Sequence, residues 1–472
     1  MTPSTRLSSS FVLVLVLAAA AFAQESPPPP EDAQKKIEEL ERRVRALEEA
    51  LRKAEVSGAA AADAQKLEDE IDMLVARVDA MAQQPGSGVT GGGGPLRLID
   101  ISADGLFAAG TSTATDDEIA ALEAGGHDPR QRGFSVQNVE LTFAGAVDPY
   151  FRGDIHVVTF IDSEGETQLE LEEAYLTTLA LPGDLQLKGG HYFTEFGRIN
   201  PRHPHEWDFV DQPVILSRVF GADGLRAPGA RLSWLAPTPF FLELQTGMQN
   251  ARGETVVSFL SSDEAGLPTG RPFTDQSISS LADFLYTERL AASFDLSDES
   301  TLSPGVSALF GPNSSGPDAR TEIYGADLFY KWRALSNDQG WPFFSVQGEY
   351  VLRNYEAEEA TDDDGNVVPG EDLVDQGFYV QALCGFERPW VAGLRFDYAE
   401  GEESDVLEES ADPSRDRRYR ISPNLTYYPS HFSKIRLQYN YDDSQFLSGD
   451  GSEHSVWLQF EFLFGAHGAH KF

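Results

Sequence analysis

One segment of the chain mixes basic and acidic side chains in a way that suits the control of ion passage. The other long polar segments are mostly acidic, whereas residues 195–224 carry both signs of charge. Arginines that line a narrow, partly desolvated opening favour anions, and carboxylates in the same place favour cations. These charges either set such a selectivity or pair with one another and brace the segment. The candidates are Arg198, Arg202, His203, His205, Asp208, Asp211, Arg218 and, just beyond the segment, Arg226.

The histidines of this region raise the question of a metal. Imidazole is a good zinc ligand, but His203 and His205 flank Pro204 in a loop, which is a poor arrangement for shared coordination. Residues 362–371 approach a calcium-loop spacing without its first ligand, so divalent-cation binding by the acidic loops stays open. No G-x-S-x-G or comparable motif surrounds a serine. We predict no metal site, no cofactor and no enzymatic activity.

The elements that would position these charges are strands. From Leu96 onward, stretches of about ten residues alternate apolar and polar side chains, which is the period of a β-strand with two different faces. Sixteen such stretches can be counted. They cover residues 97–110, 134–147, 150–161, 168–181, 184–194, 225–235, 239–250, 288–296, 301–310, 321–332, 342–355, 377–386, 390–398, 417–427, 432–441 and 452–464.

The junctions between these strands support the count independently. Every junction from an even to an odd strand is short, whereas most of the others are longer or more acidic. A missed or invented strand would reverse this alternation further along the chain, and no reversal occurs. The short junctions are 148–149, 182–183, 236–238, 297–300, 334–340, 388–389 and 429–431.

Short turns on one rim and long loops on the other are typical of an outer-membrane barrel. We therefore predict an all-β transmembrane antiparallel barrel of about 16 strands over residues 96–472. Its outer face would be apolar, as in Val139-Glu140-Leu141-Thr142-Phe143, and its inner face would line a wet lumen. A soluble β-sandwich would alternate similarly but explains neither the strand number nor the N-terminus. Basic residues expected to face the lumen are Arg152, Lys188, Arg395 and Arg436.

The first 95 residues read as three segments. Residues 1–23 resemble a signal peptide, with Arg6, an apolar stretch and an Ala21-Phe22-Ala23 cleavage site. Residues 24–84 carry apolar side chains at spacings of three and four, which predicts a periplasmic α-helical coiled coil that trimerises the protein, or a two-helix hairpin. Residues 85–95 form a Gly- and Pro-rich linker.

Charge and composition narrow the partners. The formal net charge of −40 argues against nucleic acid, and the single cysteine, Cys384, rules out a disulfide within one chain. The chain ends in Phe472, and a terminal aromatic resembles the signal by which the barrel assembly machinery recognises its substrates. Expected partners are other copies of the chain in a homotrimer, outer-membrane lipid, lipopolysaccharide and small solutes.

Two stretches carry a family resemblance. Glu173-Ala174-Tyr175-Leu176 and residues 187–197, followed by the long charged segment and Pro213, resemble the phosphate-selective porin O and P family. The resemblance covers about three-quarters of the chain and implies a sixteen-stranded, usually trimeric diffusion channel that is often anion-selective. Some relatives carry an N-terminal coiled coil. The basic residues on which phosphate selectivity rests in that family have no residue-by-residue match here.

These observations predict a Gram-negative outer-membrane porin for passive diffusion of small, anionic solutes, with its coiled coil in the periplasm. One alternative is an energised uptake barrel of the TonB-dependent receptor type, which needs about 22 strands around a plug. Another is an envelope tether, in which the coiled coil acts and the barrel only anchors it.

Overall fold

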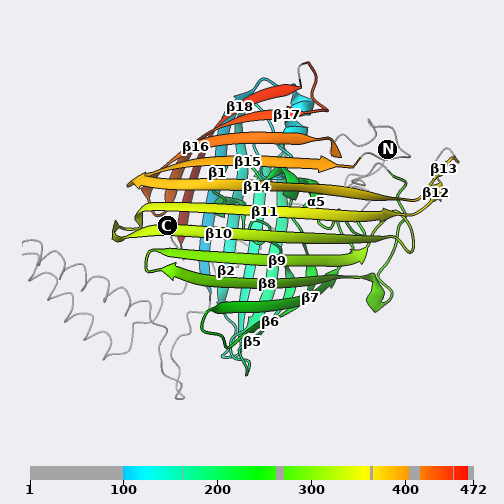
Figure 1. The fold of residues 1–472 in the computed structure, drawn as a ribbon, viewed down its shortest axis with the longest axis horizontal. Helices are drawn as coiled ribbons and strands as arrows, with labels where there is room; N and C mark the ends of the chain where they lie inside the picture. Colours follow the sequence, from blue (N-terminus) through cyan, green and yellow to red (C-terminus); the bar gives the residue numbers. More distant parts are fainter. Residues whose placement is uncertain are drawn as a thin grey trace, which may run out of the picture. The chain divides into compact units, whose positions relative to one another are not determined.

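A computed structural model describes residues 99–162, 164–261, 271–361, 365–402, 415–449 and 451–465. Within them, sixteen strands lie in chain order in one sheet, each antiparallel to its neighbours. The last strand pairs with the first, with Phe107 opposite Phe460, so the sheet closes into a barrel (Figure 1). The predicted barrel and its strand number are confirmed. The proposed signal peptide, coiled coil and linker, and Phe472, lie outside the described residues.

Each predicted strand corresponds to one strand of the barrel. The barrel strands are β1 (Asp100–Ser112), β2 (Gly133–Ala146), β3 (Phe151–Ile161), β4 (Thr167–Thr178), β5 (Leu185–Phe193), β6 (Arg226–Leu235), β7 (Phe241–Asn250), β8 (Phe284–Ser297), β9 (Ser300–Pro312), β10 (Arg320–Asp338), β11 (Trp341–Ala357), β14 (Glu371–Glu387), β15 (Trp390–Gly401), β16 (Arg418–Ser430), β17 (Ser433–Ser444) and β18 (Ser452–Gly465). A separate two-stranded sheet joins β12 (Ala360–Thr361) to β13 (Val367–Val368). The helices are α4 (Asp116–Leu122), η1 (Pro204–Glu206), α5 (Val214–Phe220) and η2 (Leu281–Asp283).

The predicted short junctions are turns between consecutive strands, and those of the front strands, such as β8–β9 and β14–β15, lie on the left in Figure 1. Only residues 298–299 separate β8 from β9, and only residues 388–389 separate β14 from β15. One boundary differs, because β10 continues to Asp338 where the sequence predicts a turn from residue 334. The small β12–β13 hairpin projects at the opposite end, among the long segments.

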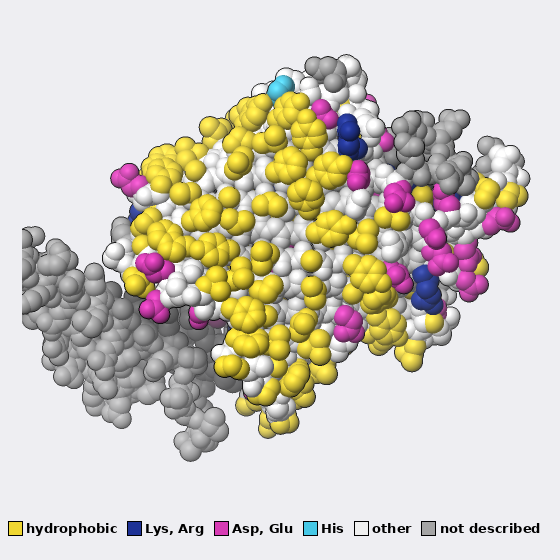
Figure 2. Space-filling view, viewed as in Figure 1, with side chains coloured by type: hydrophobic (Ala, Val, Ile, Leu, Met, Phe, Trp, Pro, Cys, Tyr) yellow, Lys and Arg dark blue, Asp and Glu magenta, His cyan; other side chains and the backbone are white. Residues whose placement is uncertain are grey.

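Side chains alternate between the two faces of the barrel as predicted. In β18, Val456, Leu458 and Phe460 are exposed on the outer face, whereas Trp457 and Gln459 are buried inside. Apolar side chains cover a broad part of the outer face, and acidic residues gather near both ends of the strands (Figure 2). Contact of such an apolar surface with lipid is favourable, whereas its exposure to water is not. Among the described residues, no helix has the length and apolar character needed to cross a membrane.

The interior differs from the wet lumen that the sequence predicts. The segment between β5 and β6 folds into the barrel, and its helix α5 packs against inward-facing residues such as Ile323, Val351 and Tyr379. Phe259 and Leu260, from the segment after β7, join the same apolar cluster. Because side chains of the inserted segments cover the inner wall here, this part of the barrel has a packed core rather than a water-lined surface.

Candidate channel constriction

The inserted segment, residues 194–225, is held at both of its ends by one side chain. Asn200 donates hydrogen bonds to the carbonyls of Thr194 (2.8 Å) and Leu225 (3.0 Å), and accepts one from the Leu225 amide (2.8 Å). Gly197 has a φ of 59°, and a Cβ there would lie 1.7 Å from Glu349. A glycine is therefore required where the chain turns from β5 toward the middle of the barrel.

Positive charge is in excess where one side of the segment meets the inner wall of β5–β10. Lys188 lies 3.1 Å from Glu195, and Arg231 pairs with the same carboxylate. Arg198 and Arg289 each lie 2.8 Å from Asp327. Four cations therefore share two carboxylates. The side chains of Lys188, Arg198 and Glu195 keep 13%, 15% and 22% of their surface exposed, so this side of the segment is partly open to solvent.

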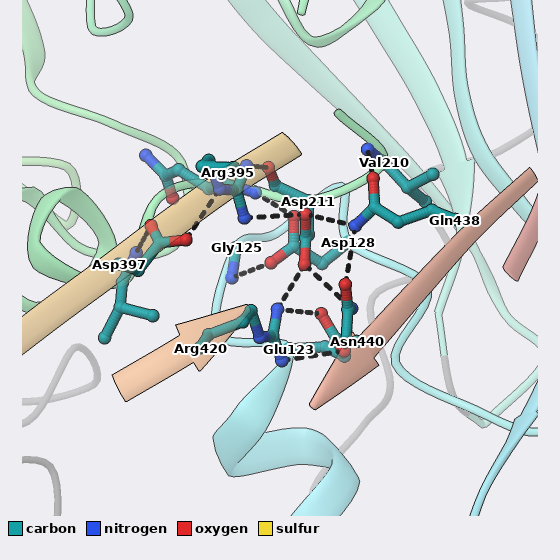
Figure 3. A network of polar contacts seen from close by, with 12 residues as sticks. Glu123, Gly125, Asp128, Val210, Asp211, Arg395, Asp397, Arg420, Gln438 and Asn440 are labelled. Atoms are coloured by element: carbon teal, nitrogen blue, oxygen red, sulfur yellow. Dashed lines mark hydrogen bonds and ion pairs between the residues drawn. The ribbon is translucent and has the colours of Figure 1, made fainter. Parts of the chain in front are cut away.

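The opposite side of the segment forms a buried ion-pair network around Asp211 (Figure 3). Asp211 lies 2.8 Å from Arg395 of β15 and also pairs with Arg420 of β16. Gln438 and Asn440 of β17 donate to it at 2.8 and 3.1 Å. Because these side chains have almost no exposed surface, this network braces the segment against the wall and is closed to solutes.

A second inserted segment contributes to the network. The Glu123 carboxylate, which directly follows α4, lies 2.9 Å from Arg420, while Arg420 also lies 2.8 Å from Asp442. A capping box between Thr115 and Glu118 begins α4 and thereby sets the position of the residues that follow it. The β1–β2 and β5–β6 segments therefore brace each other inside the barrel.

Asp211 stays ionised because of its partners. Burial raises the pKa of its carboxyl, but Arg395 and Arg420 lower the pKa more strongly, so that it lies at about 2. The charge of Asp211 is therefore present across the whole physiological pH range.

The two histidines of the segment face a third region, the inner side of β1–β4. His203 lies 2.7 Å from Glu172 and 3.0 Å from Glu173, and His205 lies 3.1 Å from Glu140. Burial lowers the pKa of His205, but Glu140 more than compensates for this and raises the pKa to about 9. This side of the segment is also buried and pairs opposite charges.

The structure thus divides the residues predicted from the sequence into groups. Arg198 and Lys188 lie at the partly exposed side, and Arg202 is half-buried. The others are used in contacts with the wall or with neighbouring loops. Asp208 accepts a hydrogen bond from Gln381, and Arg436 donates one to the Trp207 carbonyl. Arg218 donates hydrogen bonds to the carbonyls of Arg415 and Asp416. Arg226 forms an ion pair with Glu170, and Arg152 forms one with Asp154 near the turn before β3.

Sequence reasoning missed several members of these groups. Arg231, Arg289 and Asp327 complete the cationic side, and Arg420 and Glu123 complete the Asp211 network. The signal available for Arg231 and Arg289 is their position on the inward-facing parity of β6 and β8. Nothing in the sequence marks Glu123, because it comes from a segment that does not look different from the other acidic loops.

Comparison of the sequence with family models gives no match. The chain is 30% identical over 405 residues to an uncharacterized protein of Aquifex aeolicus (strain VF5), an alignment that covers 79% of this chain and 80% of that protein. The chain belongs to the family of this Aquifex protein. The similarity extends over most of both chains and is therefore not confined to a single motif.

Solved structures with a similar fold are outer-membrane proteins. The channel DcaP of Acinetobacter baumannii is 13% identical with a TM-score of 0.49, and the similarity covers 78% of this chain and 96% of that one. An anion-selective porin from Comamonas acidovorans is 8% identical with a TM-score of 0.45, covering 78% and 99%. OprB of Pseudomonas putida is 11% identical with a TM-score of 0.46, covering 78% and 94%.

Proposed function

We propose that the chain is an outer-membrane porin, a water-filled channel for the passive diffusion of small anionic solutes. Two features of the barrel support a membrane channel. Its outer face is apolar between two polar ends, as a lipid bilayer requires. Sixteen strands also enclose an interior wide enough for an aqueous path. The inserted segments then narrow that path to one side of the barrel.

The observation that carries the preference for anions is the distribution of charge at the narrowed side. Lys188, Arg198, Arg231 and Arg289 form their ion pairs with Glu195 and Asp327, so that four cations meet two carboxylates in these pairs. On the other sides of the segment, the charges are buried against opposite charges, and solutes cannot reach them. A solute that passes between the segment and β5–β10 therefore meets a net positive potential, which attracts anions and repels cations.

The direct test is the current through single channels in a planar lipid bilayer. With a salt gradient across the bilayer, the sign of the reversal potential gives the selectivity, and we expect it to favour the anion. The resemblance to phosphate-selective porins makes inorganic phosphate the first solute to add, with block of the chloride current as the readout. Correctly folded protein that never opens a channel would disprove the proposal.

Reversing one charge at the narrowed side should shift the selectivity. In Lys188→Glu, the anion-to-cation permeability ratio should fall at least tenfold. An ion about 4 Å from a unit charge in water interacts by about 1 kcal/mol, and the reversal changes this energy by about 2 kcal/mol, in opposite directions for anions and cations. The matched control is Arg252→Glu. Arg252 lies in the segment after β7, paired with Asp275, with 48% of its side chain exposed. Equal shifts in the two variants would contradict an opening beside Lys188.

We also infer that residues 24–84 form a periplasmic coiled coil that holds three barrels together, after removal of residues 1–23 and with residues 85–95 as a tether. Deletion of residues 31–84 should abolish the crosslinked trimer while leaving the conductance of each barrel unchanged, since all sixteen strands of the closed barrel come after residue 99. If the protein acts as an envelope tether, the same deletion would abolish the function of the protein in the cell although the barrel still conducts ions.

A further inference from the structure

Three histidines and four carboxylates meet inside the barrel on the side of β1–β4. His203 and His205 come from the β5–β6 segment, and His156 comes from β3. The carboxylates are Asp104 of β1, Glu140 of β2, and Glu172 and Glu173 of β4. All four carboxylates are at most 5% exposed. These residues are distant in the sequence, and only closure of the barrel and insertion of the segment bring them together.

The distances within this cluster match those between the ligands of one metal ion. Zinc binds imidazole nitrogen and carboxylate oxygen at about 2.0–2.2 Å, so neighbouring ligand atoms of a tetrahedral site lie about 3.3 Å apart. The Glu140 Oε2 atom lies 3.2 Å from His203 Nδ1 and 3.1 Å from His205 Nδ1. One ligand atom each from Glu140, His156 and His203 lie within 4.8 Å of one another.

The cluster also contains buried oxygen atoms without hydrogen bonds. Within the part of the chain that the structure describes, Glu172 Oε1 and both oxygens of Asp104 have no hydrogen-bond partner, whereas Glu140 Oε2 is shared by His203 and His205. Glu140 and Glu172 are 1% exposed and Asp104 is 2% exposed. An orphaned buried carboxylate oxygen is costly, and a bound cation would satisfy it. The neighbouring ammonium of Lys434 is already 2.5 Å from Glu461.

An outer shell for such a site is present. A histidine that binds a metal through one ring nitrogen usually donates its other N–H to a carboxylate, which fixes the ring. In His203, Nε2 lies 3.0 Å from Glu173, while Nδ1 lies 2.7 Å from Glu172 and 3.2 Å from Glu140, so Nδ1 would exchange its contact with Glu172 for the ion. The His156 and His203 rings have their centroids 4.5 Å apart, close enough for both to reach one ion.

We propose that Glu140, His156, His203 and His205 bind one zinc ion inside the barrel, with Glu173 as the carboxylate that orients His203. Two of these ligands belong to the wall and two to the inserted segment, so the ion would fasten the segment to β2 and β3. Imidazole and carboxylate ligands suit zinc better than calcium or magnesium, which prefer oxygen alone, and zinc binding would displace the protons that the ring nitrogens otherwise share with the carboxylates. The proposal rests on the geometry of the barrel and not on the proposed channel function.

The test uses the full chain without an affinity histidine tag, with His467 and His470 replaced by alanine to remove histidines at the C-terminus. After chelation and dialysis, the protein is titrated with Zn²⁺ in the presence of excess Ca²⁺, which occupies the acidic loops. We expect one zinc per chain by elemental analysis. Co²⁺ in its place should give the visible absorption of a tetrahedral site with nitrogen ligands. Zn²⁺ should also slow tryptic cleavage after Arg202, which lies next to the ligands.

Variants locate the ion. His156→Ala with His203→Ala should lower the zinc affinity at least 100-fold, and Glu173→Gln should lower it about 10–100-fold, as for outer-shell carboxylates in other sites. His431→Ala is the control, since this histidine lies at the β16–β17 turn. If the double variant fails to fold, judged by its electrophoretic mobility before and after heating, Glu173→Gln still decides. Folded wild-type protein that binds no zinc, or equal binding by Glu173→Gln and the wild type, would overturn the proposal.

Discussion

Replacing Asp211 by asparagine is expected to loosen the inserted segment from the wall of the barrel. Removing one partner of a buried ion pair usually costs about 3–5 kcal/mol, because the other charge is left in a dry environment. We expect about 3 kcal/mol here, since Arg395 keeps Asp397 and Arg420 keeps Glu123 and Asp442. If the segment detaches and reattaches faster than trypsin cleaves it, this free-energy change raises the fraction of molecules with a detached segment about 100-fold. The rate of tryptic cleavage after Arg218 rises by the same factor.

The effect should depend on pH with a definite sign. The pKa of Asp211 in the folded protein is lowered from an ordinary 3.8 to about 2. Its stabilising contribution is therefore complete above about pH 5 and is lost as the pH falls toward 2. The difference between the wild type and Asp211→Asn should shrink over that range. The control is Asp116→Asn, which removes an exposed partner of Arg132 and should cost at most about 1 kcal/mol. Equal protease resistance of wild type and Asp211→Asn at neutral pH would contradict the bracing role.

Replacing Val219 by aspartate is expected to displace α5 from the interior of the barrel. Val219 belongs to α5 and is fully buried in the apolar cluster. A charge without a partner there costs several kcal/mol or drives α5 out of the core. Because α5 and its neighbours fill the interior next to β10, β11 and β14, its release should raise the single-channel conductance severalfold and make the current noisier.

The matched control is Val367→Asp. Val367 lies in β13, in the small hairpin beyond the barrel, and 59% of its surface is exposed. The same substitution there should leave the conductance unchanged. A Val219→Asp channel with wild-type conductance and wild-type protease resistance would show that α5 does not limit the path.

Most of the barrel could be predicted because its strands and turns are specified by residues that are close in the sequence. Alternation of side chains with a period of two is visible within each strand, as in Val456 to Phe462, and depends on no distant residue. Tight turns such as Arg388-Pro389 also depend on neighbouring residues alone. The order of the strands then needs no further information, since consecutive antiparallel strands joined by short turns pair with each other.

The site could be predicted only in part. The sequence singled out the segment between β5 and β6 by its mixed charge, and the structure places that segment inside the barrel. Whether a given charge braces the segment or faces a solute depends on the wall it meets. Arg395 is separated from Asp211 by 184 positions, and its inward parity alone does not show that a carboxylate from a loop will cover it. The apolar core beneath α5 is equally hidden, because Ile323 and Val351 lie on faces expected to be wet.

Neighbouring residues alone were therefore enough to predict the number of strands, their faces, the ends at which turns and loops lie, and the segment in which charges of both signs collect. The tertiary structure decided how those charges are divided among a partly exposed cationic side, the buried network of Asp211 and the histidine cluster beside Glu140. The physical reason is the range of the interactions. Strand pairing depends on residues that are close in the sequence. Ion pairs and the proposed set of metal ligands form between atoms that only the closed barrel brings within about 4 Å of one another.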